Sequence, residues 1–234
     1  GPWQPAPPSA NGVRAGAPPP PRAHVTIVDK PDAGRTALIA GRLAVARTDP
    51  DFLPATVATA VLSGYSGRLN REIRVKRGLS YGAGAQLIAR RDSGLFLAST
   101  LIDHTKVDEA TTVVLETLEA LAAGAPDAVE LERRKATLIG GFYRGIETTD
   151  GIVGTLGEYA LYSLPLRDLD DYVPHIEATS AEAVRAATAA YFAHDAFVVL
   201  VGNESIFGDA IRAAHPHVDV VPFSELDLAS ADLR

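Results

Sequence analysis

An arginine and a tyrosine, Arg74 and Tyr81, stand with six residues between them in the stretch from Arg71 to Gly82. A phenol can donate a hydrogen bond to an oxygen that gains negative charge, and a guanidinium can hold a carbonyl or carboxylate in a fixed orientation. Taken alone, the pair also fits a structural interpretation, with Arg74 an exposed helix cation and Tyr81 a strand residue packed on the core. The residues around the pair therefore decide how it is interpreted.

The histidines form no metal-binding motif. A catalytic zinc takes about three protein ligands, and two of them commonly lie one turn apart on a helix. No His-x-x-Glu-His segment occurs in either orientation, and Pro216 keeps its two neighbours from sharing a helical face, which indicates a surface turn there. The chain also has no cysteine, so its sequence predicts no metal site. The six histidines are His24, His104, His175, His194, His215 and His217.

A distinctive order of residues precedes Arg74. It begins with residues 47–52, Arg-Thr-Asp-Pro-Asp-Phe, continues through an apolar helical run, and ends with residues 62–70, Leu-Ser-Gly-Tyr-Ser-Gly-Arg-Leu-Asn. Together with Arg74 and Tyr81, this order resembles the C-terminal, zinc-free half of pitrilysin/insulinase-type zinc metallopeptidases and is similar to processing peptidase subunits. The resemblance extends over approximately residues 23–222.

The resemblance implies a role for the chain as the non-catalytic, substrate-binding half of a zinc-dependent peptidase. Arg74 and Tyr81 would reach across into the active site of a zinc-bearing half. Tyr81 would act as the catalytic hydrogen-bond donor to the oxyanion or substrate carbonyl, and both residues would bind the peptide. The cofactor, zinc, is expected in the missing or partner half, either an N-terminal half or a partner subunit, and this chain alone should be inactive.

Two other functions stay open from the sequence. One is a structural or assembly subunit of the same fold without proteolytic activity, against which the presence of both Arg74 and Tyr81 argues. The other is a freestanding peptide-binding module. The segment Gly82-Ala83-Gly84 opens no helix and is not a phosphate loop; it is expected to let a strand backbone approach a neighbour or substrate. In the resembled family, peptides can add to the sheet edge as an extra strand.

The composition is that of a globular chain. Its 234 residues are 47% hydrophobic and 22% charged, which is enough apolar material for a sizeable core. The net charge of -7 argues against nucleic acid as a partner. No apolar run reaches the roughly 18 residues of a membrane span. The resemblance suggests a periplasmic or secreted location, with which the lack of cysteine is compatible.

Residues 1–22 differ from the rest in being rich in proline, glycine and alanine. Such a segment cannot build a core and favours extended geometry, so it is predicted to be an interdomain linker, with residues 23–234 forming the peptidase-type domain. A ligand for an aromatic groove is the alternative for residues 18–21. The absence of methionine predicts an excised or processed piece, and Gly1-Pro2 is either a cleavage scar or native continuation.

From residue 24 onward, strand and helix patterns predict an α+β class, a two-layer domain with a largely antiparallel sheet covered by helices on one face. Asp49, Thr105 and Thr179 are the predicted helix N-caps, and Gly78 is predicted to end the helix that carries Arg74. The charged run on the helix after Pro126 is expected to be a solvated face. Strands are expected at residues 25–28, 37–45, 81–89, 94–102 and 196–201, and helices at 50–63, 66–76, 105–123, from 126, 151–162, 166–176, 180–192 and 204–214.

Overall fold

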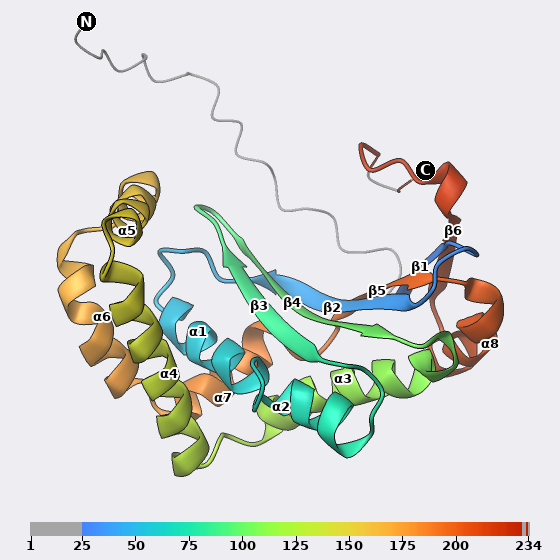
Figure 1. The fold of residues 1–234 in the computed structure, drawn as a ribbon, viewed down its shortest axis with the longest axis horizontal. Coiled ribbons are helices and arrows are strands. Elements are labelled where there is room, and N and C mark those ends of the chain that lie inside the picture. The colour runs from blue at the N-terminus through green and yellow to red at the C-terminus, as the bar shows by residue number, and fades with distance from the viewer. Residues whose placement is uncertain (1–24, 231–232, 234) are drawn as a thin grey trace, which may run out of the picture.

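A six-stranded sheet organises the part of the chain that the structure, a computed structural model, describes, which is residues 25–230 and 233 (Figure 1). The predicted linker at residues 1–22 lies outside the described residues. The strands are β1 (Val25–Asp29), β2 (Thr36–Ala44), β3 (Ala83–Ala89), β4 (Gly94–Ile102), β5 (Phe197–Gly202) and β6 (Val218–Pro222).

The order across the sheet is β3-β4-β2-β5-β1-β6. The three pairings from β3 to β5 are antiparallel, and β1 pairs in parallel with β5 on one side and β6 on the other. The sheet is therefore largely antiparallel, as predicted. Strands β3 and β6 form its two edges.

The helices do not alternate strictly with the strands, because five consecutive α-helices separate β4 from β5. A π-helix, Arg71–Lys76, directly continues the helix that begins at Arg68, and short 3-10 turns lie at His104–Lys106 and, after β6, at Phe223–Glu225. The α-helices are α1 (Phe52–Leu62), α2 (Arg68–Asn70), α3 (Val107–Ala123), α4 (Ala128–Ile146), α5 (Thr149–Tyr162), α6 (Arg167–Ala178), α7 (Ala181–Tyr191) and α8 (Glu204–Ala214).

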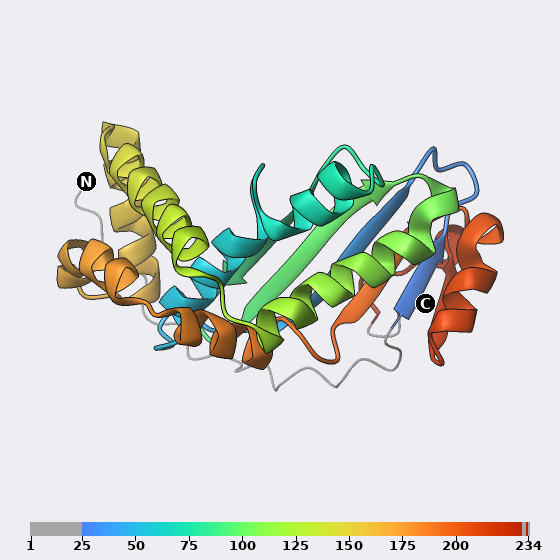
Figure 2. The same cartoon turned by 90° about the horizontal axis from the view of Figure 1, so that it is seen from below.

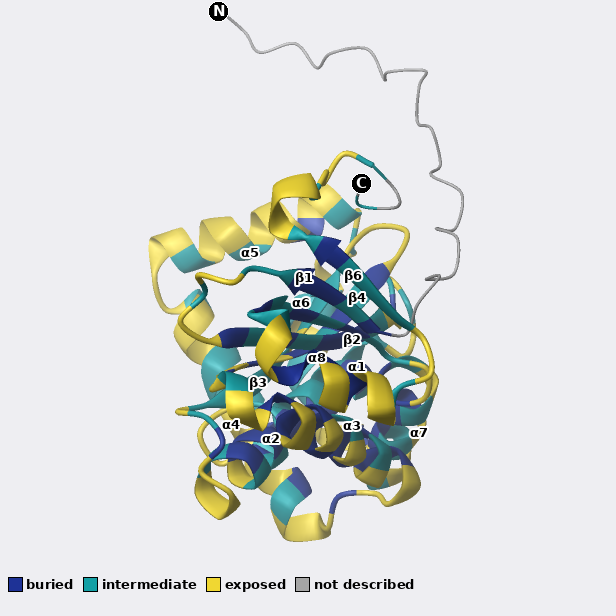
Figure 3. Ribbon diagram, turned by 90° about the vertical axis from the view of Figure 1, so that its right-hand side faces the viewer, coloured by how far each residue is buried: buried dark blue, intermediate teal, exposed yellow. Residues whose placement is uncertain are grey.

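Helices cover one face of the sheet, which confirms the predicted two-layer α+β fold. Helices α1, α2, α3 and α7 lie beneath the strands in Figure 1, and Figure 2, seen from below, shows α3 lying over the sheet. Helices α4, α5 and α6 pack on one another at one side and contact this layer through α1. The buried residues gather between the sheet and its helices, while the outer helix surfaces are exposed (Figure 3).

Aromatic and aliphatic side chains fill the space between the two layers. Phe96 of β4 and Phe192 at the end of α7 are fully buried, and their rings stack with centroids 3.7 Å apart. Leu38 of β2 and Leu118 of α3 pack in the same core. Burial of each such side chain contributes about 1.5–3 kcal/mol, so this layer holds the helices rigidly against the strands.

Three predicted N-caps are wrong by one or two positions. The side chain of Asp49 accepts a hydrogen bond from the N–H of Asp51 at 2.8 Å, which forms a turn and starts α1 only at Phe52. Each site offers two capping residues one or two positions apart, and helix boundaries predicted from sequence are uncertain by about that much. Asp51, Asp103 and Ser180 occupy cap positions in place of Asp49, Thr105 and Thr179, with Asp103 capping the 3-10 turn before α3.

Two further expectations need correction. The strand predicted from Tyr81 begins at Ala83, so Tyr81 lies in a bend before β3. The edge strand β6 was missed, because its five residues gain strand structure only by pairing with β1 at the other end of the chain. The charged run on α4 is only partly solvated, since Lys135 is buried and donates a 2.8 Å hydrogen bond to the carbonyl of Glu177 on α6.

Candidate functional site

The backbone around Arg74 is a helix that widens and then stops. Arg74 lies in the π-helix, a form that needs i→i+5 hydrogen bonds and is often found at functional sites. Gly78 ends it with a φ of 60°, and the N–H of Leu79 bonds the carbonyl of Ile73 at 2.8 Å. Because Ile73 and Leu79 are buried, Arg74 remains on the outer side of the helix.

Tyr81 stands on a bend that is fastened to β4. The hydroxyl of Ser80 donates to the carbonyl of Leu101 at 2.6 Å, and the hydroxyl of Thr100 donates to the carbonyl of Gly82 at 2.9 Å. The side chain of Tyr81 is 82% exposed. The interpretation of Tyr81 as a core-packing strand residue is therefore wrong.

The structure brings Arg74 and Tyr81 together and adds a second tyrosine. The guanidinium carbon of Arg74 lies 4.6 Å from the ring centroid of Tyr81 and 5.3 Å from that of Tyr65. Tyr65 is 78% exposed, so both rings present most of their surface to solvent. Cation–π contacts of this kind hold a guanidinium in place without using its N–H donors.

Sequence reasoning missed Tyr65 as a site residue. Its turn is held by the buried side chain of Asn70, whose Nδ2 donates to the carbonyl of Tyr65 at 2.6 Å and whose Oδ1 accepts from the N–H of Ala83 at 3.4 Å. Arg134 of α4 also donates to the carbonyl of Ser66. One signal was available, a large aromatic residue between glycines at 64 and 67, but no local pattern places it beside Arg74.

Among the described residues, no carboxylate forms an ion pair with the guanidinium of Arg74. Glu72, two residues before Arg74, accepts hydrogen bonds of 2.7 Å from both Lys76 and Arg77. Burial raises the pKa of Glu72, but these bonds and the two positive charges outweigh it and hold the pKa below its usual value. The acidic group nearest in sequence is thus already neutralised, and the guanidinium of Arg74 can bind a ligand.

Several backbone N–H and C=O groups on the edge of β3 near this site already form hydrogen bonds to side chains. The N–H of Ala83 bonds Asn70, and that of Ala85 bonds the hydroxyl of Ser63 at 3.1 Å. The carbonyl of Ala89 accepts from the phenol of Tyr162 at 3.4 Å. A peptide added here as an extra strand would have to displace these bonds. The backbone of Gly84 approaches a neighbour closely, as expected, because a Cβ at this position would lie 3.2 Å from the hydroxyl oxygen of Ser63.

The described residues contain no group of three or more His, Cys, Asp or Glu side chains arranged to hold a metal ion. His104 instead lies between the hydroxyl of Thr36 at 2.7 Å and the carbonyl of Ala33 at 2.8 Å. His194 pairs with Glu119, with Nδ1 and Oε2 2.9 Å apart. Both histidines therefore have structural partners.

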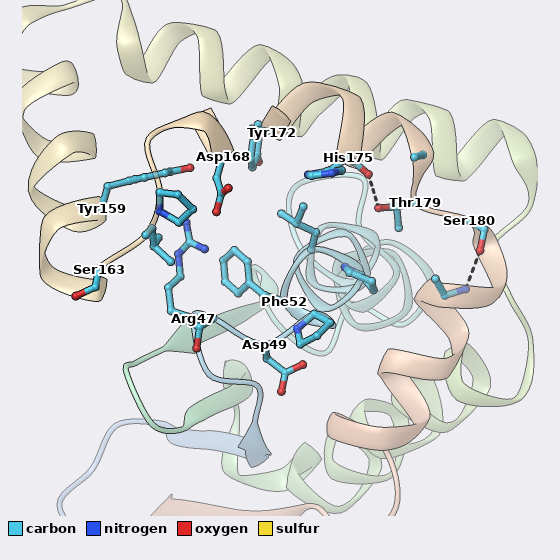
Figure 4. Close-up of a pocket in the computed structure, with 18 residues that line it drawn as sticks. Arg47, Asp49, Phe52, Tyr159, Ser163, Asp168, Tyr172, His175, Thr179 and Ser180 are labelled. Atoms are coloured by element: carbon cyan, nitrogen blue, oxygen red, sulfur yellow. Dashed lines mark hydrogen bonds between the residues drawn. The ribbon is translucent and has the colours of Figure 1, made fainter. Parts of the chain in front are cut away.

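A cavity of about 630 Å³ lies elsewhere, between α1, α5, α6 and α7 (Figure 4). At its centre the guanidinium of Arg47 lies 4.2 Å from the ring centroid of Phe52, and its Nε donates to Glu158 at 2.8 Å. Burial raises the pKa of Tyr159 and of Tyr172, which line it. Because Arg47 is neutralised and joins α5 to α1, we assign this cavity a structural role.

A family model described as the peptidase M16 inactive domain matches residues 2–138. The match covers more than half of the 234 residues, and the chain belongs to this family. It is an inactive C-terminal domain of the M16 zinc proteases, which confirms the resemblance predicted from the segment around Arg74 and Tyr81. No helix in the described part of the chain is long and apolar enough to cross a membrane.

Known proteins agree with this assignment. An uncharacterized zinc protease of Streptomyces coelicolor is 28% identical over 150 residues, which are 64% of this chain and 33% of the relative. The chain thus spans about a third of the length of that curated relative. A solved peptidase M16 inactive domain from Pseudomonas fluorescens has a TM-score of 0.71 and 26% identity, covering 78% of this chain and 44% of that one.

A second solved structure is close to this chain in extent. It is described as an inactive peptidase domain from Bordetella parapertussis, with a TM-score of 0.64 and 22% identity over 74% of this chain and 96% of that chain. At this identity the likeness shows the fold alone.

Proposed function

We propose that this chain is the substrate-binding half of a zinc-dependent peptidase and completes the active site of a zinc-bearing half. One observation carries the proposal: Arg74 stands between two exposed tyrosine rings with no carboxylate partner among the described residues. A charged group held by packing, with its donors free, is suited to bind a ligand.

Each side chain has a chemical role in this proposal. Tyr81 donates its phenolic hydrogen to the scissile carbonyl oxygen as that oxygen becomes an oxyanion, and Arg74 orients a neighbouring carbonyl or carboxylate of the peptide. Zinc, held by the partner half, would supply polarisation of the carbonyl and activation of a water. The residues of this chain therefore bind and position, and they stabilise charge that develops on the substrate.

The relatives support the need for a second half. Those named as zinc proteases are about three times as long as the stretch they share with this chain, which leaves room for a zinc-bearing half in the same polypeptide or a partner subunit. We also propose that residues 1–22 are the connector between the halves and that the protein works in the periplasm or after secretion. Fractionation of cells that express the tagged full-length protein tests the location.

The deciding experiment reconstitutes this chain with the zinc-bearing half and measures peptide cleavage. Tyr81→Phe should lower kcat by roughly 100–1,000-fold, the usual loss of one oxyanion donor. Arg74→Ala should lower kcat and also raise KM, since the guanidinium anchors the bound peptide. Arg167→Ala, at an exposed arginine on α6, is the matched control and should retain full activity.

Two controls complete the experiment. The isolated chain should hold no stoichiometric zinc after dialysis and cleave no peptide, and neither variant should change the zinc content of the assembled enzyme. Near wild-type kcat/KM for Tyr81→Phe and Arg74→Ala would instead favour a structural or assembly role for this chain. Peptide binding without any zinc-bearing partner in the parent organism would favour a freestanding binding module.

A further inference from the structure

A second, basic cavity lies beside the Arg74 site. It measures about 330 Å³ and is formed by the turn at Ser66, the start of the α2 helix and the first turns of α4. Its charged lining consists of four arginines and two acids, Arg68, Arg71, Arg133, Arg134, Asp127 and Glu130. The arginines exceed the acids by two, although the whole chain has a net charge of -7.

Both acids in the cavity are already engaged. Glu130 accepts hydrogen bonds from the Nε and Nη2 of Arg68, the shortest at 2.6 Å from Nη2, and the two side chains neutralise each other. Asp127 caps α4 by accepting the N–H of Glu130 at 2.8 Å. A capping carboxylate offsets the positive end of the helix rather than a distant guanidinium.

The other three arginines are poorly compensated. Arg71 comes only within 3.8 Å of Glu72, which Lys76 and Arg77 already bind. The exposed Arg133 has no ion pair with any described residue.

Arg134 is the third of these poorly compensated arginines. It donates to the carbonyl of Ser66, but its buried Nε has no hydrogen-bond partner among the described residues. Burial lowers the pKa of its guanidinium; Glu130 opposes that shift, and the charges of Arg71 and Arg133 add to it. Arg134 therefore has an unmet donor, and Glu130 compensates its positive charge only in part.

The cavity shares a turn and a helix with the proposed substrate site. Tyr65 and Ser66 are adjacent in one turn: the ring of Tyr65 flanks Arg74, and the carbonyl of Ser66 is bound by Arg134 in the cavity wall. Arg71 and Arg74 are three residues apart in the same π-helix. A peptide held by Arg74 would therefore pass close to the basic cavity.

We propose that this cavity binds an acidic side chain, Asp or Glu, of the peptide that Arg74 and Tyr81 contact. The inference rests on the proposed function for its substrate class, a peptide. Guanidinium groups bind carboxylates in planar, two-point geometry, and three poorly compensated arginines around one cavity favour such a ligand. The cavity would then give the peptidase a preference for substrates with an acidic residue near the scissile bond.

The test measures peptide binding to the isolated 234-residue chain, so it does not depend on assembly with a zinc-bearing half. Two fluorescently labelled peptides would be compared by anisotropy, identical except that three glutamates in one are glutamines in the other. The acidic peptide should bind about tenfold more tightly, the effect of one charge-assisted hydrogen-bond pair. The double variant Arg71→Glu/Arg133→Glu, at two exposed positions, should abolish this difference.

Arg167→Glu is the control and should keep the preference, because it makes the same arginine-to-glutamate exchange once, at an exposed arginine on α6 outside the cavity. Equal binding of the two peptides, or an unchanged preference in the double variant, would overturn the inference. Displacement of the acidic peptide by inorganic phosphate, but not by chloride of equal ionic strength, would overturn it in favour of a phosphate site. A preference retained in chains with Tyr81→Phe separates this result from failure of the proposed catalytic role.

Discussion

The guanidinium of Arg74 lies 4.6 Å from the ring centroid of Tyr81, across a helix end, a glycine turn and a bend. The buried side chains of Ile73 and Leu79 fix the backbone between them, so the contact is held by the core. The cation–π contacts with Tyr81 and Tyr65 do not use the N–H donors of the guanidinium. The two residues therefore form one unit, and substitutions in them should not act independently.

The first prediction concerns this coupling. In the reconstituted enzyme, Tyr81→Phe should cost much less kcat/KM in an Arg74→Ala background than in the wild type, with a further loss below about tenfold. The reason is that loss of Arg74 already frees the ring of Tyr81. A double-mutant cycle of kcat/KM measures the effect, and losses that simply multiply would show that the two side chains act separately.

Tyr65 supplies the second prediction. Tyr65→Ala removes one of the two rings that flank Arg74, and loss of an exposed cation–π contact should raise KM by about two- to fivefold with little change in kcat. Tyr65→Phe keeps the ring and should behave as wild type. Tyr143→Ala, at another exposed tyrosine, is the control and should leave KM unchanged. An equal rise in KM for the Tyr65 and Tyr143 variants would contradict the assignment.

Asn70 is predicted to set the stability of the site. Asn70→Ala leaves the carbonyl of Tyr65 and the N–H of Ala83 without their buried partner and should lower the free energy of unfolding by about 1–3 kcal/mol. Asn203→Ala removes a comparable amide-to-carbonyl bond at an exposed position, to Pro31, and should change it by less than about 0.5 kcal/mol. Urea unfolding measures both, and equal midpoints for the two variants would refute the role of Asn70.

The fourth prediction is a loss of stability at high pH. Burial raises the pKa of Tyr172, so the folded chain keeps this phenolic proton when the unfolded chain has lost it. The contribution to stability is complete below about pH 10 and is lost as the pH rises further. Tyr172→Phe, which keeps the stacking on Phe142, should leave stability at pH 7 nearly unchanged and reduce its fall above pH 10.

Urea midpoints at pH 7 and above pH 10 measure this effect. Tyr143→Phe removes an exposed phenol and should keep the alkaline loss of the wild type. Tyr159 shifts in the same direction, so the single variant should remove only part of the loss. Identical pH profiles for the wild type and Tyr172→Phe would rule out Tyr172 as a source.

The last prediction concerns the proline-rich segment. Deletion of residues 1–22 should change the melting temperature by no more than a few degrees, because proline and alanine in extended geometry bury little apolar area. Trp3 is the one large aromatic side chain in that segment. Scanning calorimetry of the full and shortened chains checks this, and a larger drop would indicate that the segment packs on the domain.

The sequence predicted the elements whose patterns are local and missed those that depend on distant partners. The predicted hairpin of β3 and β4 is present, since both strands and their polar turn are contiguous. Strand β6 forms only by pairing with β1, and Lys135 is buried only because the carbonyl of Glu177 reaches it from α6. Neither partner is visible in a window of sequence.

The candidate site divides in the same way. Arg74 and Tyr81 were found through the resemblance that they carry together with residues 47–52 and 62–70, since their spacing alone also fits a structural interpretation. Tyr65 joins them because Asn70 and Arg134 hold its turn from two elements, a relationship that no spacing rule contains. Arg134 itself was expected on a solvated face, and its burial follows from the packing of α4 against that turn.

The π-helix that carries Arg74 has one further consequence, for insertions and deletions. A π-helical turn accommodates about one residue more than an α-helical turn, so deletion of a single residue between Asn70 and Gly78 would allow the segment to relax into an ordinary α-helix. Such a change leaves the composition almost intact but rotates Arg74 away from both tyrosines. Whether a relative keeps the site therefore depends on the number of residues in this short helix as well as on the identity of its exposed residues.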